Sequence, residues 1–255
     1  MFEIEGHSST DPLPPLAVLC EDGPVLAVNK PAGLLTQGVP SGIPTLEAQV
    51  KAFLKEKYHK PGNVYLGIPH RLDRPVSGVV LFARNSKAAA RLAEQFRERQ
   101  VKKIYWCVLE RPPDPTEGAL TDFLIKHADQ AHVQVVAPET PNAKLASLRY
   151  RMLTASENGT LVEVELETGR MHQIRVQVAS RGWPVLGDVQ YGASRMLADS
   201  GDPPEPRSAA IALHARCLTF LHPIRYEPIT VTAPLPGAWH KLDVSLPEQV
   251  VAPPA

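Results

Sequence analysis

Apolar positions in the first part of the chain follow two different periods. Residues 16–20 and 25–28 alternate around a Glu-Asp-Gly step, which predicts two strands joined by a turn. Apolar residues then recur at helical spacing over 46–53, directly after Thr45, a residue type that is typical of helix N-caps. The chain therefore begins with strands followed by a helix that ends before Pro61.

The middle and last parts continue this mixture. Strands are predicted at 79–84 and 102–109, and the second is apolar on both faces, which indicates a central position in a sheet. Between them Ser86 is predicted to cap a helix. Further strands are predicted at residues 120–125, 133–136, 143–153, 161–167 and 229–233, with turns at Asp129-Gln130 and Asn158-Gly159. The four strands from 120 to 167 are expected to form an antiparallel meander.

A second feature of this region is a helix predicted over 171–181. Its spacing places His172, Arg175 and Ala179 on one face and leaves Val176 for the core. Gly182-Trp183-Pro184 is expected to end it. The order of elements predicts an α+β fold with a mixed, mostly antiparallel sheet flanked by helices and carrying a central cleft. We expect one domain over 16–245, a loose leader at 1–15, a mobile loop at 194–208 and a disordered tail at 246–255.

The charge of the chain is balanced overall but uneven locally. It has 27 Lys and Arg against 27 Asp and Glu, which argues against a basic coat for nonspecific nucleic-acid binding. Residues 84–103 nevertheless hold seven basic residues and only Glu94 and Glu98 as acidic ones. This basic segment suits an RNA backbone, and a solvated helix face is the alternative.

Cysteine content and targeting signals limit the class of protein. The three cysteines are far apart and odd in number, so we expect free thiols in a reducing cytoplasm, with no disulfide framework and no metal site. No signal peptide and no stretch of roughly 18 apolar residues is present, so no membrane association is expected. Phosphate-binding, dinucleotide and zinc motifs are absent, so no cofactor is expected.

The strongest chemical signal is residues 70–78, His-Arg-Leu-Asp-Arg-Pro-Val-Ser-Gly, which lead into an apolar run. Asp73 lies between Arg71 and Arg74, so we expect it to stay ionised, and an ionised carboxylate is a competent nucleophile or base. The alternative is a surface aspartate that caps a turn or pairs with an arginine.

This segment resembles the H-R-L-D-x-x-x-S-G motif of the RluA-type RNA pseudouridine synthases. Five further blocks occur in that family's order, at residues 29–34, 101–105, 169–175, 186–192 and 213–215. The similarity runs from about residue 19 to about residue 240. Six ordered blocks identify the chain as a member of this family, and its substrate stays open.

The resemblance implies isomerisation of uridine to pseudouridine in RNA: the bond from C1′ to N1 breaks, the uracil turns, and C5 joins C1′. Asp73 would attack the ribose or the base, or assist loss of the 2′ proton, and the sequence does not choose among these routes. The resemblance also implies that Tyr105 stacks on the target base and that Arg175 holds Asp73 by a charge-assisted hydrogen bond, for which a bidentate geometry is open to an arginine. These three are the predicted catalytic residues.

Five further residues are predicted to bind substrate. The resemblance places Lys30 beside the cleft and Leu213 near the base pocket, and Arg71 is predicted to fill the position that the flipped base leaves. Arg74 and His172 complete the set. The plain alternatives are a solvent-exposed Lys30, a core Tyr105 and a surface Arg175.

The expected partner is a structured RNA, ribosomal or transfer, bound by a monomer without an N-terminal S4 domain. The chain departs from the family pattern at Pro75-Val76, Gln177 and Val189-Gln190, and these departures bear on substrate choice. Two rivals remain: a non-catalytic RNA-binding protein on the same scaffold, and a hydrolase that uses Asp73 with His70 or His172.

Overall fold

The computed structural model describes residues 15–38, 43–127, 132–197, 209–242 and 244. The expected leader (except residue 15), the Asp129-Gln130 turn, most of the 194–208 loop and the expected tail lie outside the described residues.

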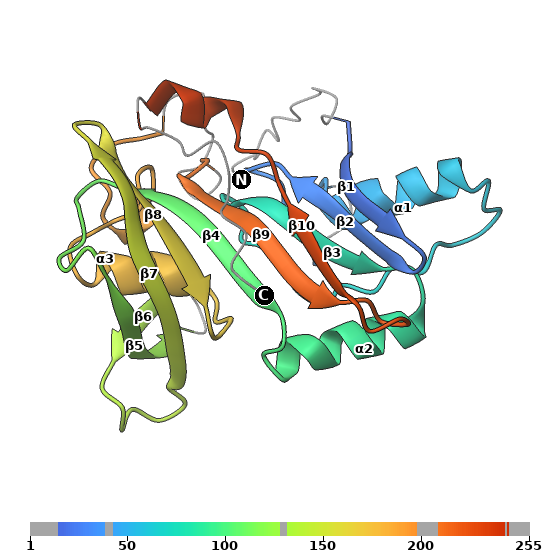
Figure 1. The fold of residues 1–255 in the computed structure, drawn as a ribbon, viewed down its shortest axis with the longest axis horizontal. Coiled ribbons are helices and arrows are strands. Elements are labelled where there is room, and N and C mark those ends of the chain that lie inside the picture. The colour runs from blue at the N-terminus through green and yellow to red at the C-terminus, as the bar shows by residue number, and fades with distance from the viewer. Residues whose placement is uncertain (1–14, 39–42, 128–131, 198–208, 243, 245–255) are drawn as a thin grey trace, which may run out of the picture.

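Within these residues ten strands form one sheet (Figure 1). They are β1 (Ala17–Asp22), β2 (Val25–Lys30), β3 (Ser77–Ala83), β4 (Lys102–Leu109), β5 (Glu117–Lys126), β6 (Val133–Val136), β7 (Lys144–Ser156), β8 (Gly159–Leu166), β9 (Leu213–Leu221) and β10 (Pro228–Thr232). The order is β1-β2-β3-β9-β4-β8-β7-β5-β6, and β10 pairs with β9. All neighbours are antiparallel except β3 and β9, so the mixed, mostly antiparallel sheet is confirmed, and β4 is central as predicted.

Three α-helices accompany the sheet: α1 (Leu46–Lys57), α2 (Ser86–Arg97) and α3 (Gln173–Ala179). Two short 3-10 helices follow, η1 (Val189–Tyr191) and η2 (Gly237–Leu242). Thr45 caps α1 as predicted, because its side chain accepts the Ala48 N–H. The predicted cap of α2 is wrong: Asn85 has the extended backbone of an N-cap and accepts the Ala88 N–H at 2.9 Å, so Ser86 is already helical.

Alternation along β2 and β3 explains how helices cover both faces of this part of the sheet. Leu26, Val28 and Phe82 join the main core, to which α1 contributes Leu46, Val50 and Leu54. Their odd-numbered neighbours, such as Ala27 and Leu81, pack in a second cluster with Ala88 and Leu92 of α2. Strands buried on both faces carry the continuous apolar runs seen in the sequence.

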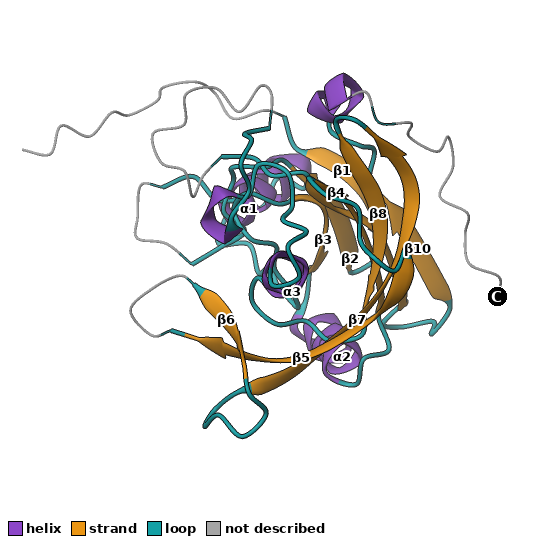
Figure 2. Ribbon diagram, turned by 90° about the vertical axis from the view of Figure 1, so that its left-hand side faces the viewer, coloured by secondary structure: helices purple, strands orange, loops and turns teal. Residues whose placement is uncertain are grey.

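The predicted meander is wrong in one respect. β5 pairs with both β6 and β7, so β6 lies at the edge of the sheet and β7 does not contact it as a neighbour. The physical reason is length: β6 has four residues, whereas β7 has 13 and finds a partner of 10 residues in β5. The sheet curves, and α3 lies on its concave side (Figure 2).

The parallel contact between β3 and β9 depends on Gly78. Ser77 lies opposite His214 and Gly78 opposite Ala215. Gly78 has φ +116°, and a Cβ at this position would lie 2.3 Å from the Ala215 carbonyl oxygen. The Ser-Gly step is therefore required for the close approach of the two backbones. Ser77 strengthens the junction, because its hydroxyl lies 2.8 Å from His214 Nδ1.

The helix predicted over 171–181 is shorter than expected. It begins at Gln173 because His172 has a left-handed backbone, with φ 53°. It ends at Ala179, two residues before the predicted end, and the predicted stop at Gly182 lies in the turn that follows, where Gly182 has φ +80° and donates its N–H to the Ala179 carbonyl.

Candidate active site

Asp73 lies in a tight loop that precedes β3, and the segment 33–36 fixes this loop from one side. Thr36 Oγ1 donates to the Leu72 carbonyl at 2.9 Å and accepts the Leu72 N–H at 3.2 Å. Gly33 N–H donates to the Arg74 carbonyl, and Arg74 Nε donates back to the Gly33 carbonyl. The residues before and after Asp73 are thus both held in place by the first of the sequence blocks.

Lys30 belongs to the same support. It is fully buried, and its Nζ donates to the carbonyl oxygens of Pro31, Leu34 and Arg74 at 2.9, 2.7 and 3.1 Å. Burial lowers the pKa of Lys30 to about 7, although the charge of Asp73 acts in the opposite direction. Lys30 and Arg74 do not line the cleft, so the geometry favours loop support for both over the predicted substrate contact.

The cleft has a volume of about 760 Å³ and is lined from several elements. Asp73 reaches it from its loop, Tyr105 from β4 and Leu213 from β9, while His172 and Arg175 reach it from the start of α3. The predicted central cleft therefore brings together all three predicted catalytic residues and, among the predicted substrate contacts, Arg71, Leu213 and His172.

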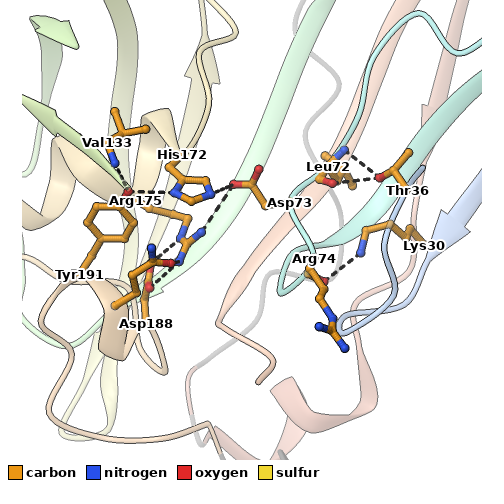
Figure 3. A network of polar contacts seen from close by, with 11 residues as sticks. Lys30, Thr36, Leu72, Asp73, Arg74, Val133, His172, Arg175, Asp188 and Tyr191 are labelled. Carbon is orange, nitrogen blue, oxygen red and sulfur yellow. Dashed lines mark hydrogen bonds and ion pairs between the residues drawn. The ribbon is translucent and has the colours of Figure 1, made fainter. Parts of the chain in front are cut away.

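Asp73 faces two cationic or polar nitrogens. Its Oδ2 lies 3.7 Å from His172 Nε2 and 3.7 Å from Arg175 Nη1 (Figure 3). Arg71 is exposed to solvent, and Arg74 donates a hydrogen bond to the Gly33 carbonyl. These two sequence neighbours therefore do not form the surroundings of the Asp73 carboxylate that the sequence predicted. Residues far away in the sequence supply its charged environment instead.

Arg175 is bound most tightly to Asp188, not to Asp73. Its Nε and Nη2 donate to the two Asp188 oxygens at 2.6 and 2.8 Å, and Nη2 also donates to Gln190 Oε1 at 3.0 Å. Burial opposes the charge of Arg175, but Asp188 and Asp73 outweigh burial and raise the pKa of its guanidinium. The bidentate partner predicted for Arg175 is therefore corrected to Asp188, a residue that the sequence prediction missed although its block was noted.

Tyr191 is the second missed residue. Its hydroxyl accepts the Val133 N–H at 3.0 Å and lies 2.8 Å from His172 Nδ1, while its ring lies under the Arg175 guanidinium, 4.9 Å from centroid to Cζ. Burial raises the pKa of Tyr191 to about 12, so it keeps its proton. The sequence block at residues 186–192, which contains Tyr191, was the available signal.

Two aromatic or apolar side chains form the wall opposite α3. Tyr105 is half-buried on β4, and burial with the nearby charge of Asp73 raises the pKa of its phenol well above its usual range. Leu213 is buried at the start of β9. A flat ring and an aliphatic side chain beside a carboxylate suit a planar, uncharged base.

His70 also lines the cleft but serves the scaffold. Its Nε2 accepts the Leu81 N–H at 2.9 Å, and its ring stacks on Phe96 with centroids 4.7 Å apart. Burial lowers the pKa of His70 to about 3. Because its Nε2 lone pair is already used, His70 does not suit the base of the rival hydrolase.

The basic segment of residues 84–103 divides between two surfaces. Arg84 donates a hydrogen bond to Glu21, and Arg91 donates one to the Pro223 carbonyl. Neither side chain lines the cleft. The cleft receives the later members of the segment. Its lining contains Arg71, Arg97, Arg99, Lys103, Lys126, Arg170 and Arg175 against Asp73 and Glu167. The net positive charge therefore comes from four parts of the chain.

Two departures from the family pattern have structural partners. Gln177 is fully buried, and its Nε2 donates to Asp122 Oδ2 at 2.7 Å, which ties α3 to β5. Gln190 adds an acceptor for Arg175. Gln190 thus acts at the site, whereas Gln177 acts on its support.

Solved structures with the same architecture define the class of protein. Human RNA Pseudouridylate Synthase Domain Containing 4 matches with a TM-score of 0.72 and 26% identity, covering 91% of this chain and 95% of that one. Human RNA Pseudouridylate Synthase Domain Containing 1 matches with a TM-score of 0.66, covering 87% and 84% of the two chains, and at 24% identity it supports the fold alone. The fold is that of the pseudouridylate synthases.

Sequence comparison defines the family. The family model described as RNA pseudouridylate synthase matches residues 24–180. The dual-specificity RNA pseudouridine synthase RluA of Escherichia coli is 35% identical over 224 residues, covering 87% of this chain and 94% of its own. An uncharacterised RNA pseudouridine synthase of Zymomonas mobilis is 34% identical, with 88% and 96% covered. Ribosomal large subunit pseudouridine synthase D of Xylella fastidiosa is 35% identical, with 89% and 69% covered.

This chain belongs to the RluA-type RNA pseudouridine synthase family and is an enzyme that isomerises uridine to pseudouridine in RNA. No helix in the described part of the chain is long and apolar enough to cross a membrane.

Proposed function

We propose that this enzyme modifies a specific uridine in ribosomal or transfer RNA and that Asp73 is its nucleophile. The observation that carries the proposal is the position of the Asp73 carboxylate: it lies in the cleft, 3.7 Å from both His172 Nε2 and Arg175 Nη1, in a loop fixed on both sides. Similarity to the ribosomal large subunit pseudouridine synthase D of Xylella fastidiosa favours ribosomal RNA as the first candidate.

The cleft supports a division of roles among its residues. The target uridine leaves its stack, at a cost of roughly a few kcal/mol, and enters beside Asp73. Tyr105 and Leu213 hold the uracil from the β4 and β9 side, and Arg71, exposed at the mouth, occupies the vacated position in the RNA. The uracil stays in the cleft during the reaction. A cleft wall that holds the base and still lets the uracil rotate therefore suits the chemistry.

Arg175 and His172 support the carboxylate from the other side. Arg175 shares its charge between Asp188 and Asp73, and His172 presents a ring nitrogen to the same oxygen of Asp73. Asp73 thus faces a cation and a ring nitrogen at 3.7 Å without a short ion pair, which leaves its oxygens free to react.

Pseudouridine mapping by carbodiimide treatment and reverse-transcription stops, on RNA from cells with and without the gene, tests both parts. We expect a site that is lost without the gene and restored by the wild-type copy but not by Asp73→Asn. Glu117→Gln, the same carboxylate-to-amide change at an exposed position of β5, is the matched control and should restore the site.

The outcomes separate the rival functions. Modification by purified Asp73→Asn would overturn the role of Asp73. RNA binding without any modification by the wild-type protein on candidate RNAs would favour a non-catalytic binding protein. We also infer a monomer in the cytoplasm, in keeping with three free cysteines of which Cys107 and Cys217 are buried. Sedimentation at enzyme concentrations used in the assay checks the monomer.

A further inference from the structure

The contacts of Tyr191 favour one of the two neutral forms of the His172 ring. The Tyr191 hydroxyl accepts the Val133 N–H at 3.0 Å, and it lies 2.8 Å from His172 Nδ1. A hydroxyl has one proton to donate. Among the described residues, the one acceptor recorded for that proton is Nδ1 of His172. With Nδ1 as acceptor, the proton of a neutral imidazole lies on Nε2.

The other side of the ring gives the same answer independently. His172 Nε2 faces Asp73 Oδ2 at 3.7 Å. An Nε2–H directed at a carboxylate is attracted, whereas an Nε2 lone pair in that direction would be repelled. Both nitrogens of the ring therefore favour the Nε2–H tautomer.

The ring stays neutral in this environment. Burial lowers the pKa of His172, and the charge of Asp73 opposes this effect. Four other groups face the ring. They are Arg175 of α3, Asp188 directly before η1, His132 directly before β6, and Tyr191. Because Asp188 pairs with Arg175, their charges largely cancel near the imidazole.

The backbone of His172 adds a third observation. Its left-handed conformation, φ 53° and ψ 21°, costs about 1 kcal/mol or more for a residue with a Cβ. A helix that continued back through residue 172 would avoid this cost and turn the ring elsewhere. The strain is thus retained where it directs the imidazole between Tyr191 and Asp73.

We propose that Tyr191 is a positioning residue that fixes His172 as its Nε2–H tautomer, so that a neutral donor faces the Asp73 carboxylate. The segment 188–191 then positions both side chains that face Asp73. Asp188 and Gln190 bind Arg175, and Tyr191 binds His172. The kinetic consequence of this proposal rests on the proposed function, and its structural part does not.

The direct test is long-range ¹H–¹⁵N NMR of the imidazole nitrogens in ¹⁵N-labelled full-length protein, with His172 assigned by its loss in His172→Gln. We expect the wild type to show Nε2–H, and Tyr191→Phe, which keeps the ring and removes the hydroxyl, to show a mixture of both tautomers, because Asp73 alone then favours Nε2–H. Tyr150→Phe removes a hydroxyl that donates to the Pro115 carbonyl instead, and it should leave the tautomer unchanged. An unchanged Nε2–H state in Tyr191→Phe, or Nδ1–H in the wild type, overturns the proposal.

Kinetics on a modified RNA gives the second test. We expect Tyr191→Phe to lower kcat about tenfold, the effect of losing one oriented hydrogen bond, with KM for RNA changed by less than about twofold. His172→Gln, whose amide nitrogen reaches the position of Nε2, should retain more activity than His172→Asn, which does not reach it.

The NMR and kinetic experiments together distinguish failure of the tautomer proposal from failure of the proposed function. A changed tautomer with wild-type kcat in Tyr191→Phe would support the structural part of the proposal and overturn its kinetic part, because the Nε2–H would then not assist Asp73. If the wild type modifies no RNA, the proposed function fails while the NMR result still decides the tautomer.

Discussion

At the scale of single residues, the choice of partner for Arg175 shapes the site. Arg175 is 3% exposed and Asp188 is 1% exposed, so each would be a costly isolated charge without the other. The separations decide the pairing, 2.6 Å to Asp188 against 3.7 Å to Asp73. Asp188 thus neutralises most of the Arg175 charge, and Asp73 is the more weakly bound and more accessible carboxylate.

Asp188→Asn should therefore destabilise the protein strongly. The amide keeps the size of the side chain but leaves a buried guanidinium without its carboxylate, so we expect the free energy of unfolding to fall by about 3 kcal/mol or more. Urea titration followed by circular dichroism measures it. The control is Glu94→Gln in the exposed pair with Arg97, which should cost less than about 1 kcal/mol. Equal losses for both variants would contradict the argument.

At the scale of elements, β3 connects the Asp73 loop to the rest of the sheet. β2 pairs with it along one edge, and only Ser77 and Gly78 at its start pair in parallel with β9. This short junction brings Leu213 of β9 to the cleft beside the loop that carries Asp73. The position of the carboxylate relative to the wall of the cleft therefore depends on how closely the two backbones approach.

Gly78→Ala is expected to disrupt this junction. The new methyl would lie 2.3 Å from the Ala215 carbonyl oxygen and would force an L-residue to adopt φ +116°. We expect a loss of about 3 kcal/mol or more in the free energy of unfolding, as strain and steric overlap add. Thermal and urea unfolding measure the loss. Gly62→Ala meets no atom within 4 Å and should change stability little. Wild-type stability in Gly78→Ala would show that the strands separate without cost.

At the scale of the whole molecule, a chain with zero formal net charge concentrates positive charge in one cleft. The end of α2, the end of β5, the Asp73 loop and the segment before α3 each contribute arginine or lysine to it. Acidic residues pair with other basic residues elsewhere, as Glu21 does with Arg84 and Lys57. The positive charge of the cleft is thus produced by the placement of residues and not by the composition of the chain.

Removing charge from the cleft should weaken RNA binding in a salt-dependent way. For Arg71→Ala and Lys126→Ala, both exposed, we expect weaker binding of a fluorescently labelled hairpin RNA. Each variant should also lower the slope of log K against log salt by about one. Fluorescence anisotropy across a salt series measures both. Lys55→Ala, an exposed change on α1 outside the cleft, should leave the slope as it is. The same slope for all three variants would place the RNA elsewhere.

Much of the fold followed from local sequence. β6 was predicted at its observed bounds, and β4 at its bounds and as a central strand, because their apolar patterns and flanking turns are local properties. The cap of α2, the start of α3 and the pairing of β5 with β7 were wrong or missed. Each depends on a backbone torsion or on a competing strand that the local pattern does not contain.

The sequence by itself determined the family, the fold class and the residues Asp73, Tyr105 and Arg175 that the cleft brings together, because ordered motifs carry this information. Only the tertiary structure decided the roles around them. In the folded protein Lys30 is buried and supports the Asp73 loop, Arg175 pairs with Asp188, and Tyr191 contacts His172. The physical reason is that partner choice among buried polar groups depends on separations of about one ångström, which arise only when distant segments pack together.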